Sequence, residues 1–148
     1  MLRLSRKSVL ALEAVLDVAF NAVNSPVQSR EITERQGIPH RYLEQVMQRL
    51  VRDGVLRGVR GPRGGYMLAR PSNEITVGDV IRIVNEVDTD DDDAASGSEL
   101  GTKVVGPLWA EIENNILGWF DDITVADLCD MANRRGVTPA NYMRKIAV

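Results

Sequence analysis

The chain has 148 residues, of which 44% are hydrophobic and 26% charged, as in one globular domain or a small domain with an appendage. Its longest apolar runs are a few residues, far short of the roughly 18 to 20 that cross a bilayer, so we expect a cytoplasmic protein with no membrane partner. A single cysteine, Cys129, and a single histidine, His40, exclude an intramolecular disulfide and a Cys/His zinc site.

The net charge of −3 hides an uneven distribution of charge along the chain. Residues 1–88 carry 13 basic and 10 acidic side chains, whereas residues 89–148 carry 5 basic and 11 acidic ones. Residues 30–63 alone hold 8 arginines against 4 acidic residues, a local charge of +4. A polyanion responds to the local field, so the acidic total is compatible with a nucleic-acid-binding half.

Three helices are predicted at the start of the chain. Apolar residues recur at i, i+3, i+4 and i+7 over about residues 5–22, and "NSP" ends this first helix. A short helix follows over about 29–36, with Ile32 as its apolar anchor and Gly37 at its exit. Pro39 suits the first turn of a third helix, which Gly54 ends. The second and third helices therefore meet across a tight turn.

The pattern after Gly54 becomes typical of strands. "VLRGVR" and "YMLAR" flank a glycine- and proline-rich turn, which predicts a β-hairpin with a long basic tip. "TVGDVIRIVNEV" then predicts a helix with Thr76 as N-cap and Asp79 at its third position, a carboxylate form of the capping box. This order of elements is that of a winged helix-turn-helix, so we predict a mainly α fold with a small β-hairpin.

The chain after residue 88 has a different character. Residues 89–103 include four consecutive aspartates and show no apolar periodicity, so we expect an acidic flexible loop between a winged-helix domain over 1–88 and a helical region over 104–148. The aspartates lack the alternating ligands and closing glutamate of an EF-hand. Pro107 begins a long helix, and a second "T-V-x-D" start at Thr124, like the one at Thr76, begins a short helix that ends near Arg135. One side of the long helix is the expected two-fold dimer interface, formed by Trp109, Ile112, Ile116 and Phe120.

The third predicted helix is the candidate recognition helix, because the first residues of this helix face base edges in a helix-turn-helix complex. Arginine can pair with guanine, glutamine with adenine, and glutamate with cytosine. The residues expected in the major groove are His40, Arg41, Tyr42, Glu44 and Gln45. A solvated amphipathic face is the alternative, which the flanking helix and hairpin disfavour. With no second His or Cys nearby, a base or phosphate contact, or plain solvation, suits His40 better than a metal ion or a pH switch.

The hairpin tip "RGPRGGY" has the composition of a phosphate-binding loop. No Lys-Ser/Thr pair follows it and it leads into a strand, so a Walker-type nucleotide site is excluded. Arg60 and Arg63 on a glycine-rich wing suit instead a narrow minor groove, where the negative potential is enhanced. Ser5, Arg6 and Lys7 begin the first helix and are expected at phosphates, with a solvated terminus as the alternative. No arrangement of catalytic residues stands out, so we expect no enzyme activity.

The pieces "ERQGI", "YLEQ" and "RGPRGGY" give the chain a specific family resemblance. Residues 1–88 strongly, and residues 108–128 more weakly, resemble the Rrf-two (Rrf2) family of bacterial winged-helix transcriptional regulators. The resemblance implies a homodimer on a roughly palindromic operator in double-stranded DNA, with the long helix as its dimer interface. It maps the major-groove helix onto residues 39–52, base contacts onto Tyr42, Glu44 and Gln45, and the minor-groove arginine onto Arg60.

The same resemblance raises the question of a cofactor. Many members of the family bind an iron-sulfur cluster through three cysteines in the loop before the dimer helix. The corresponding loop here, "DTDDDDAASGSELGTK", has no cysteine, and the ligand region offers Lys103 and Gly106. We therefore expect no cofactor, and a small molecule, a partner protein or a thiol as the signal.

These observations predict a dimeric, sequence-specific DNA-binding regulator, which we expect to be a repressor. Two alternatives stay open. One is a redox- or metal-responsive regulator of the same fold, acting through Cys129 or through carboxylates such as Glu13 and the aspartate loop. The other is a winged-helix protein-interaction module whose basic face meets an acidic partner.

Overall fold

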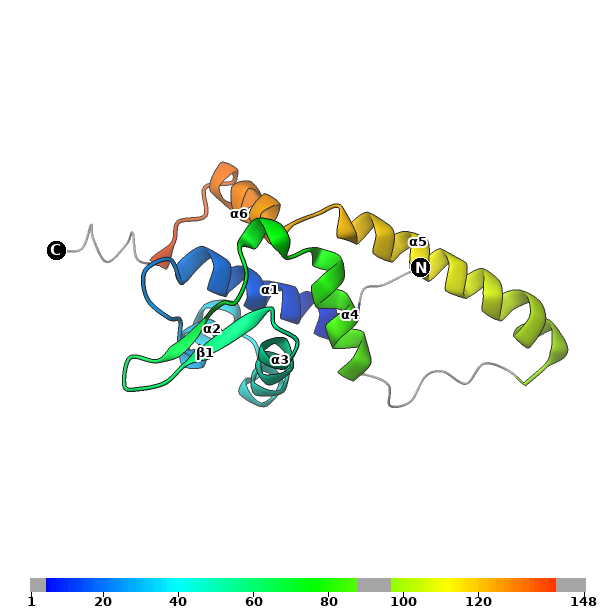
Figure 1. Cartoon of the computed structure of the whole chain (residues 1–148), viewed down its shortest axis with the longest axis horizontal. Helices are drawn as coiled ribbons and strands as arrows, with labels where there is room; N and C mark the ends of the chain where they lie inside the picture. The colour runs from blue at the N-terminus through cyan, green and yellow to red at the C-terminus, as the bar shows by residue number, and fades with distance from the viewer. Residues whose placement is uncertain (1–4, 88–96, 141–148) are drawn as a thin grey trace.

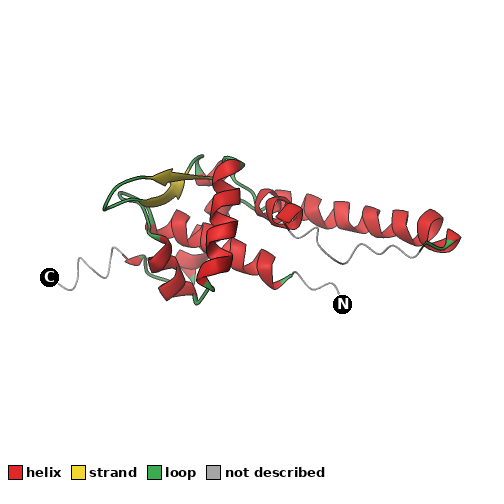
Figure 2. Ribbon diagram, turned by 90° about the horizontal axis from the view of Figure 1, so that it is seen from below, coloured by secondary structure: helices red, strands yellow, loops and turns green. Residues whose placement is uncertain are grey.

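The computed structural model describes residues 5–87 and 97–140, and it confirms the mainly α fold with one small hairpin (Figure 1). Helices α1 to α4 and the hairpin form one cluster, and α5 extends away from it (Figures 1 and 2). The elements are α1 (Arg6–Asn21), α2 (Ser29–Gln36), α3 (His40–Arg52), β1 (Leu56–Val59), β2 (Gly65–Leu68), a 3₁₀ turn (Ser72–Glu74), α4 (Val77–Val87), a π-helical turn (Gly101–Val105), α5 (Gly106–Asp121) and α6 (Val125–Arg134).

The tight turn between α2 and α3 consists of the expected residues, but Pro39 lies one position outside the helix that it was expected to begin. Gly37 ends α2 in the left-handed region at φ 65°, which a residue without Cβ adopts at little cost. Ile38 is buried, and Pro39 is the N-cap of α3 instead of a residue of its first turn. Proline is tolerated there because no helical bond needs its missing N–H.

The hydrophobic core lies between α1, α2, α3 and α4. Its largest fully buried side chains include Ile32, Ile38, Leu43, Met47 and Leu50, so the helix-turn-helix supplies much of it. The predicted apolar face of α4 is also buried, and Thr76 and Asp79 form the predicted capping box, with both reciprocal bonds at 3.0 Å. The core therefore fixes the orientation of α3.

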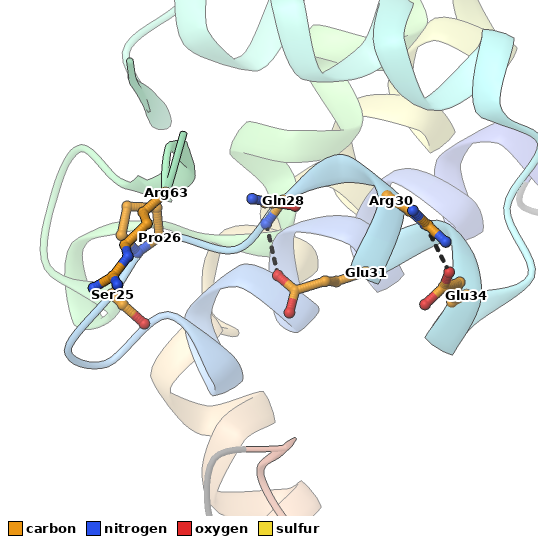
Figure 3. A pocket seen from close by; sticks show the side chains of 7 residues that line it. All are labelled: Ser25, Pro26, Gln28, Arg30, Glu31, Glu34 and Arg63. Carbon is orange, nitrogen blue, oxygen red and sulfur yellow. Dashed lines mark hydrogen bonds and ion pairs between the residues drawn. The ribbon is translucent and has the colours of Figure 1, made fainter. Parts of the chain in front are cut away.

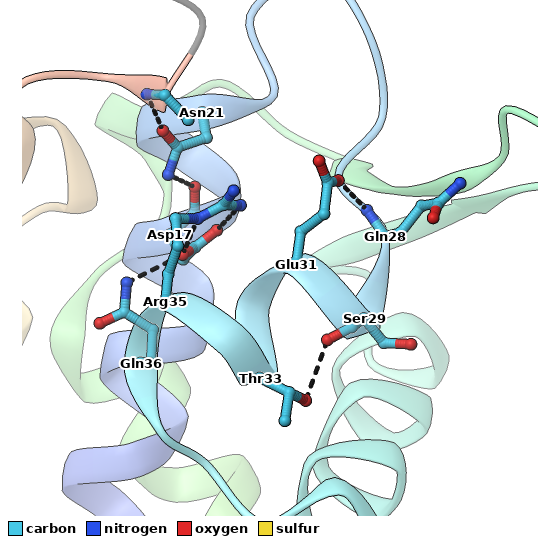
Figure 4. Close-up of polar contacts among 9 residues, drawn as sticks. Asp17, Asn21, Gln28, Ser29, Glu31, Thr33, Arg35 and Gln36 are labelled. Carbon is cyan, nitrogen blue, oxygen red and sulfur yellow. Dashed lines mark hydrogen bonds and ion pairs between the residues drawn. The ribbon is translucent and has the colours of Figure 1, made fainter. Parts of the chain in front are cut away.

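A buried polar network joins α1 to the end of α2, and nothing in the local sequence pattern predicts it (Figure 4). The Asp17 carboxylate, inaccessible to solvent, accepts hydrogen bonds from Arg35 Nε at 2.9 Å and Nη2 at 2.8 Å, and from Gln36 Nε2 at 2.8 Å. The bond to Asp17 raises the pKa of Arg35. Because both oxygens are satisfied, this charge can be buried without an unpaired partner.

Helix α6 packs back onto α1 and joins the core of the amino-terminal region. Its first residue, Val125, is buried in that core, and its N–H donates to the Ile75 carbonyl at 2.8 Å. The Val77 N–H donates to the Ile123 carbonyl at 2.8 Å. Thr124 and Asp127 form the second predicted capping box. The chain thus returns to its starting domain after α5.

The helical segment that contains α5 begins several residues before Pro107, where the sequence predicted its start. Helical residues run from Glu99 through the π-helical turn into α5, and Ser98 accepts from the Gly101 N–H at 3.0 Å. The far end of α5 is tied to α4, where Arg82 makes a bidentate ion pair with Asp121 at 2.5 and 2.7 Å. The predicted acidic loop over 89–103 is therefore wrong for residues 99–103, which are helical. Its first part, together with the rest of residues 88–96 and the tail 141–148, lies outside the described residues.

Candidate nucleic-acid interface

Helix α3 buries one face in the core and presents the other to solvent. Leu43, Val46, Met47 and Leu50 hold the inner face. The outer face consists of exposed polar and charged side chains, namely His40, Arg41, Glu44, Gln45, Gln48 and Arg52. Four of the five predicted base-reading residues therefore lie on a single solvent-facing surface.

Two of these residues contact each other. His40 Nε2 lies 3.1 Å from Glu44 Oε1, one helical turn away, and both side chains are more than half exposed. The contact uses one ring nitrogen and one carboxylate oxygen and leaves the second oxygen of Glu44 available as an acceptor. Each residue thus restricts the rotamers of the other at the start of the helix.

Tyr42, the fifth predicted base reader, is placed differently. Its side chain is half-buried against the core, and its hydroxyl donates to the Lys7 carbonyl at 2.6 Å. This bond brings the start of α1 beside the start of α3. There Ser5 uses its hydroxyl to cap α1, accepting from the Ser8 N–H at 3.1 Å, while Arg6 and Lys7 are exposed. The three predicted phosphate contacts thus lie next to the recognition helix.

The wing is a two-stranded antiparallel hairpin with Arg60 and Arg63 exposed at its tip. Leu56 pairs with Leu68 at its base, and residues 60–64 form the turn. Gly61 has φ 111°, and a Cβ on Gly64 would lie 2.1 Å from the Val59 carbonyl oxygen. These two glycines let the turn close tightly, so the arginines project from a narrow support.

A β-bridge fastens the wing to the segment before α2. The Val27 N–H donates to the Tyr66 carbonyl at 3.0 Å, and the Tyr66 N–H donates to the Val27 carbonyl at 2.8 Å. A Cβ on Gly65 would lie 2.4 Å from that Val27 oxygen, so only glycine permits this approach. Burial, and secondarily the negative charge of Glu44, raise the pKa of Tyr66. The second wing strand is therefore fastened to the segment that leads into the helix-turn-helix.

An open groove lies between the wing tip and the start of α2 (Figure 3). Arg63 and Ser25 lie at one end of it, and Arg30, paired with Glu34 at 3.0 Å, lies at the other. Gln28 reaches the wing, with its side-chain nitrogen 3.5 Å from the Pro62 carbonyl oxygen. The groove joins the basic wing to the first helix of the helix-turn-helix.

The arginines of residues 5–87 fall into two groups. Arg30, Arg35, Arg49, Arg70 and Arg82 form ion pairs with acidic side chains. The arginines of the amino end, the outer face of α3 and the wing form no ion pair with any described residue: Arg6, Arg41, Arg52, Arg57, Arg60 and Arg63. Positive charge that no carboxylate neutralises is thus concentrated on this surface, where it attracts an anion.

Sequence reasoning identified Gln45 but not the residues that follow it on the same side of α3. Gln45 lines a shallow groove along α3 together with Gln48, Arg49 and Arg52. Their spacing of three, four and seven residues places them on one side of a helix, and this spacing was the available signal. Arg49 also pairs with Asp53 at 2.9 Å and with Glu86, which ties this part of α3 to α4.

The described residues do not fit an iron-sulfur cluster. No three His, Cys, Asp or Glu side chains in residues 5–87 and 97–140 come together as a metal-binding group. Cys129 is half-buried on α6, where burial raises its pKa and disfavours the thiolate that binds iron. His40 is paired with Glu44 on α3. No helix in the described ranges is long and apolar enough to span a membrane.

A helix-turn-helix with an exposed polar recognition helix, followed by a basic wing, defines a winged-helix DNA-binding protein. Comparison with known sequences agrees: the chain belongs to the Rrf2 family, whose model, described as an iron-dependent transcriptional regulator, matches residues 4–131.

Individual relatives point to the same family. The transcriptional regulators IscR of Cronobacter sakazakii and of Escherichia coli O1:K1 are each 40% identical over 129 residues, which span 86% of this chain and 80% of each relative. The solved structure of IscR from T. potens covers 97% of the chain and 96% of its own length, with 32% identity and a TM-score of 0.74. The cysteine regulator CymR of B. subtilis has 27% identity and a TM-score of 0.68, over 88% of this chain and 98% of its own.

Proposed function

We propose that this protein acts as a homodimeric repressor that binds a palindromic operator and carries no iron-sulfur cluster. The observation that carries the proposal is the position of Arg41 on the exposed start of α3 and of Arg60 and Arg63 on the wing, none of which forms an ion pair with a described residue. Such a surface meets the polyanionic backbone and both grooves of one duplex segment. The same proposal places the protein in the cytoplasm and assigns it no enzyme activity.

In the proposed complex, the start of α3 enters the major groove. Arg41, Glu44 and Gln45 supply the donor and acceptor types that distinguish base pairs, and His40 steadies Glu44. Tyr42 has a positioning role, because the hydrogen bond from its hydroxyl to the Lys7 carbonyl holds the amino end of α1 against α3. Basic residues at that end then contact phosphates beside the groove.

The proposed dimer uses the free side of α5. Trp109 and Trp119 are 50% and 71% exposed, and Leu108 is 53% exposed, an unusual amount of apolar surface for one helix. The predicted interface residues Ile112, Ile116 and Phe120 are half-buried along the same helix. A second copy related by two-fold symmetry would cover this surface and place two recognition helices about one helical turn of DNA apart, roughly 34–36 Å.

The cluster-free part of the proposal rests on the ligand set. The single cysteine lies on α6, and the family's ligand region has no cysteine. Protein purified without oxygen should therefore be colourless and contain less than one iron per dimer. An absorbance band of an iron-sulfur chromophore would contradict this part of the proposal and leave the DNA-binding part standing.

Selection of bound fragments from genomic DNA tests the operator proposal directly. Arg60→Ala should weaken binding to the selected fragment about tenfold. It should also lower the slope of log Kd against log salt by roughly one, because the protein loses one positive charge that releases a counterion from the DNA. Arg134→Ala, which removes an exposed arginine from α6, is the matched control and should change neither. Equal affinity for selected and random fragments would contradict the proposal and favour a protein-interaction module.

A further inference from the structure

A second hollow lies between α1, the end of α2 and the segment that follows α6. Its volume is about 320 Å³, at the lower end of the range of roughly 300–1,000 Å³ for small-molecule sites. Its described lining comes from α1, α2, α6 and residues 137–140, with no residue of α3 or of the wing. The hollow is therefore separate from the surface proposed to bind DNA.

The walls of this hollow are mainly apolar. Leu16 and Phe20 contribute from α1, Ala132 from α6, and Val137 and Ala140 from the segment after it. Such a lining excludes water from one side and favours a ligand with a hydrocarbon or aromatic body.

Among the described residues, the polar part of the lining carries one uncompensated negative charge. Asp17 is fully paired with Arg35, so this buried pair is neutral as a unit (Figure 4). Asn21 is also buried, and its side chain donates to the Asp17 carbonyl and accepts from the Ala140 N–H. Glu13, half-buried at the hollow, has no ion pair or hydrogen bond with any described residue. An anionic ligand would meet this carboxylate while Arg35 is already committed to Asp17.

We propose that this hollow binds a small, mainly apolar molecule with one cationic amine, which lies against Glu13 while its body contacts Leu16 and Phe20. We also propose that this ligand changes the affinity for DNA, an effect that rests on the proposed operator binding. Arg35 and Gln36, which hold Asp17, are the last residues of α2, and Gly37, Ile38 and Pro39 alone separate them from α3. A ligand beside this pair changes the environment of the turn that orients the recognition helix.

The binding step is tested on the full chain by calorimetry with three probes that share one ring: 2-phenylethylamine, 2-phenylethanol and phenylacetate. The amine should bind most tightly. Glu13→Gln should weaken amine binding about threefold to tenfold, as expected for one partly screened ion pair, and leave the alcohol unaffected. Ala132→Leu should fill the hollow and abolish binding of both, whereas Asn133→Leu on the exposed side of α6 is the control and should bind like the wild type.

Several results would contradict the proposed amine-binding site. Phenylacetate binding as tightly as the amine would contradict the charge argument, and amine binding that survives both Glu13→Gln and Ala132→Leu would locate it elsewhere. Circular dichroism of each variant distinguishes loss of the site from loss of the fold. In a second measurement, a concentration of amine that fills the wild-type site should change the Kd for a selected operator fragment at least about threefold in the wild type, but not in Ala132→Leu, which should not bind the amine. Amine binding without this change would overturn the regulatory step alone, and a failure to find any operator would count against the proposed function and not against the site.

Discussion

The outer face of α3 and the free side of α5 are both exposed, but they differ in kind. The face of α3 is polar, and its opposite side is anchored in a close-packed core through residues such as Leu43 and Leu50. Helix α5 contains no fully buried residue and exposes both tryptophans. An exposed charge is stable in water and available to a ligand, whereas exposed apolar surface is stabilised only when another surface covers it. The first surface is complete in one chain, whereas the second needs a covering surface, which we propose is another copy of the chain.

The same substitution on the two helices should give the largest contrast. Leu43→Ala removes a fully buried side chain and should lower the free energy of unfolding by about 2–5 kcal/mol. Leu108→Ala, at an exposed position of α5, should lower it by less than about 0.5 kcal/mol in the monomer. Urea denaturation of dilute protein measures both. Equal losses would show that α5 belongs to the same folding unit.

A charge on α5 should separate the copies without unfolding them. Ile112→Asp places a carboxylate in the expected interface, so we expect a monomer in sedimentation at micromolar concentration and a loss of operator affinity of at least about a hundredfold, because two half-sites are no longer bound together. Glu111→Asp on the same turn is the control. A dimer that persists in Ile112→Asp would disprove the assignment of this side of α5.

The link between the two regions should respond to acid. The hydrogen bond from Arg82 lowers the pKa of Asp121, so this ion pair stabilises the fold above the ordinary carboxyl pKa and is lost as pH falls through the lower folded value. Asp121→Asn should therefore lower the melting temperature slightly at pH 7 and make its decline between about pH 4 and pH 2 shallower. A parallel decline in both proteins would show that the pair contributes nothing.

The smallest effect is expected at the cysteine. Cys129 is half-buried and its pKa is raised by burial, so Cys129→Ser should leave operator affinity within about twofold under oxidising and reducing conditions. A larger, oxidant-dependent difference would favour the redox-responsive alternative.

Local sequence patterns predicted those parts of the fold that local physics determines. Both Thr-to-Asp capping boxes and the end of α2 at Gly37 depend on residues within one turn, and all three are as predicted. The Asp17 to Arg35 pair was not predictable in this way, because 18 residues separate the partners along the chain.

The site shows the same division. Periodicity assigned the start of α3 to the solvent, and the structure agrees for four of the five predicted major-groove residues. It could not show that the Tyr42 hydroxyl is engaged by the Lys7 carbonyl, since that contact depends on how α1 and α3 cross. The return of α6 to the core through Val125 was missed for the same reason.

The β-bridge between Val27 and Tyr66 has a consequence for how DNA would be selected. Because this bridge joins the hairpin to the segment that leads into α2, it restrains the position of the wing relative to the helix-turn-helix. The spacing between a major-groove and a minor-groove contact is then set by the protein and not by the duplex. Sequences that bend or narrow to match that spacing would be bound in preference to stiffer ones with identical contacted bases.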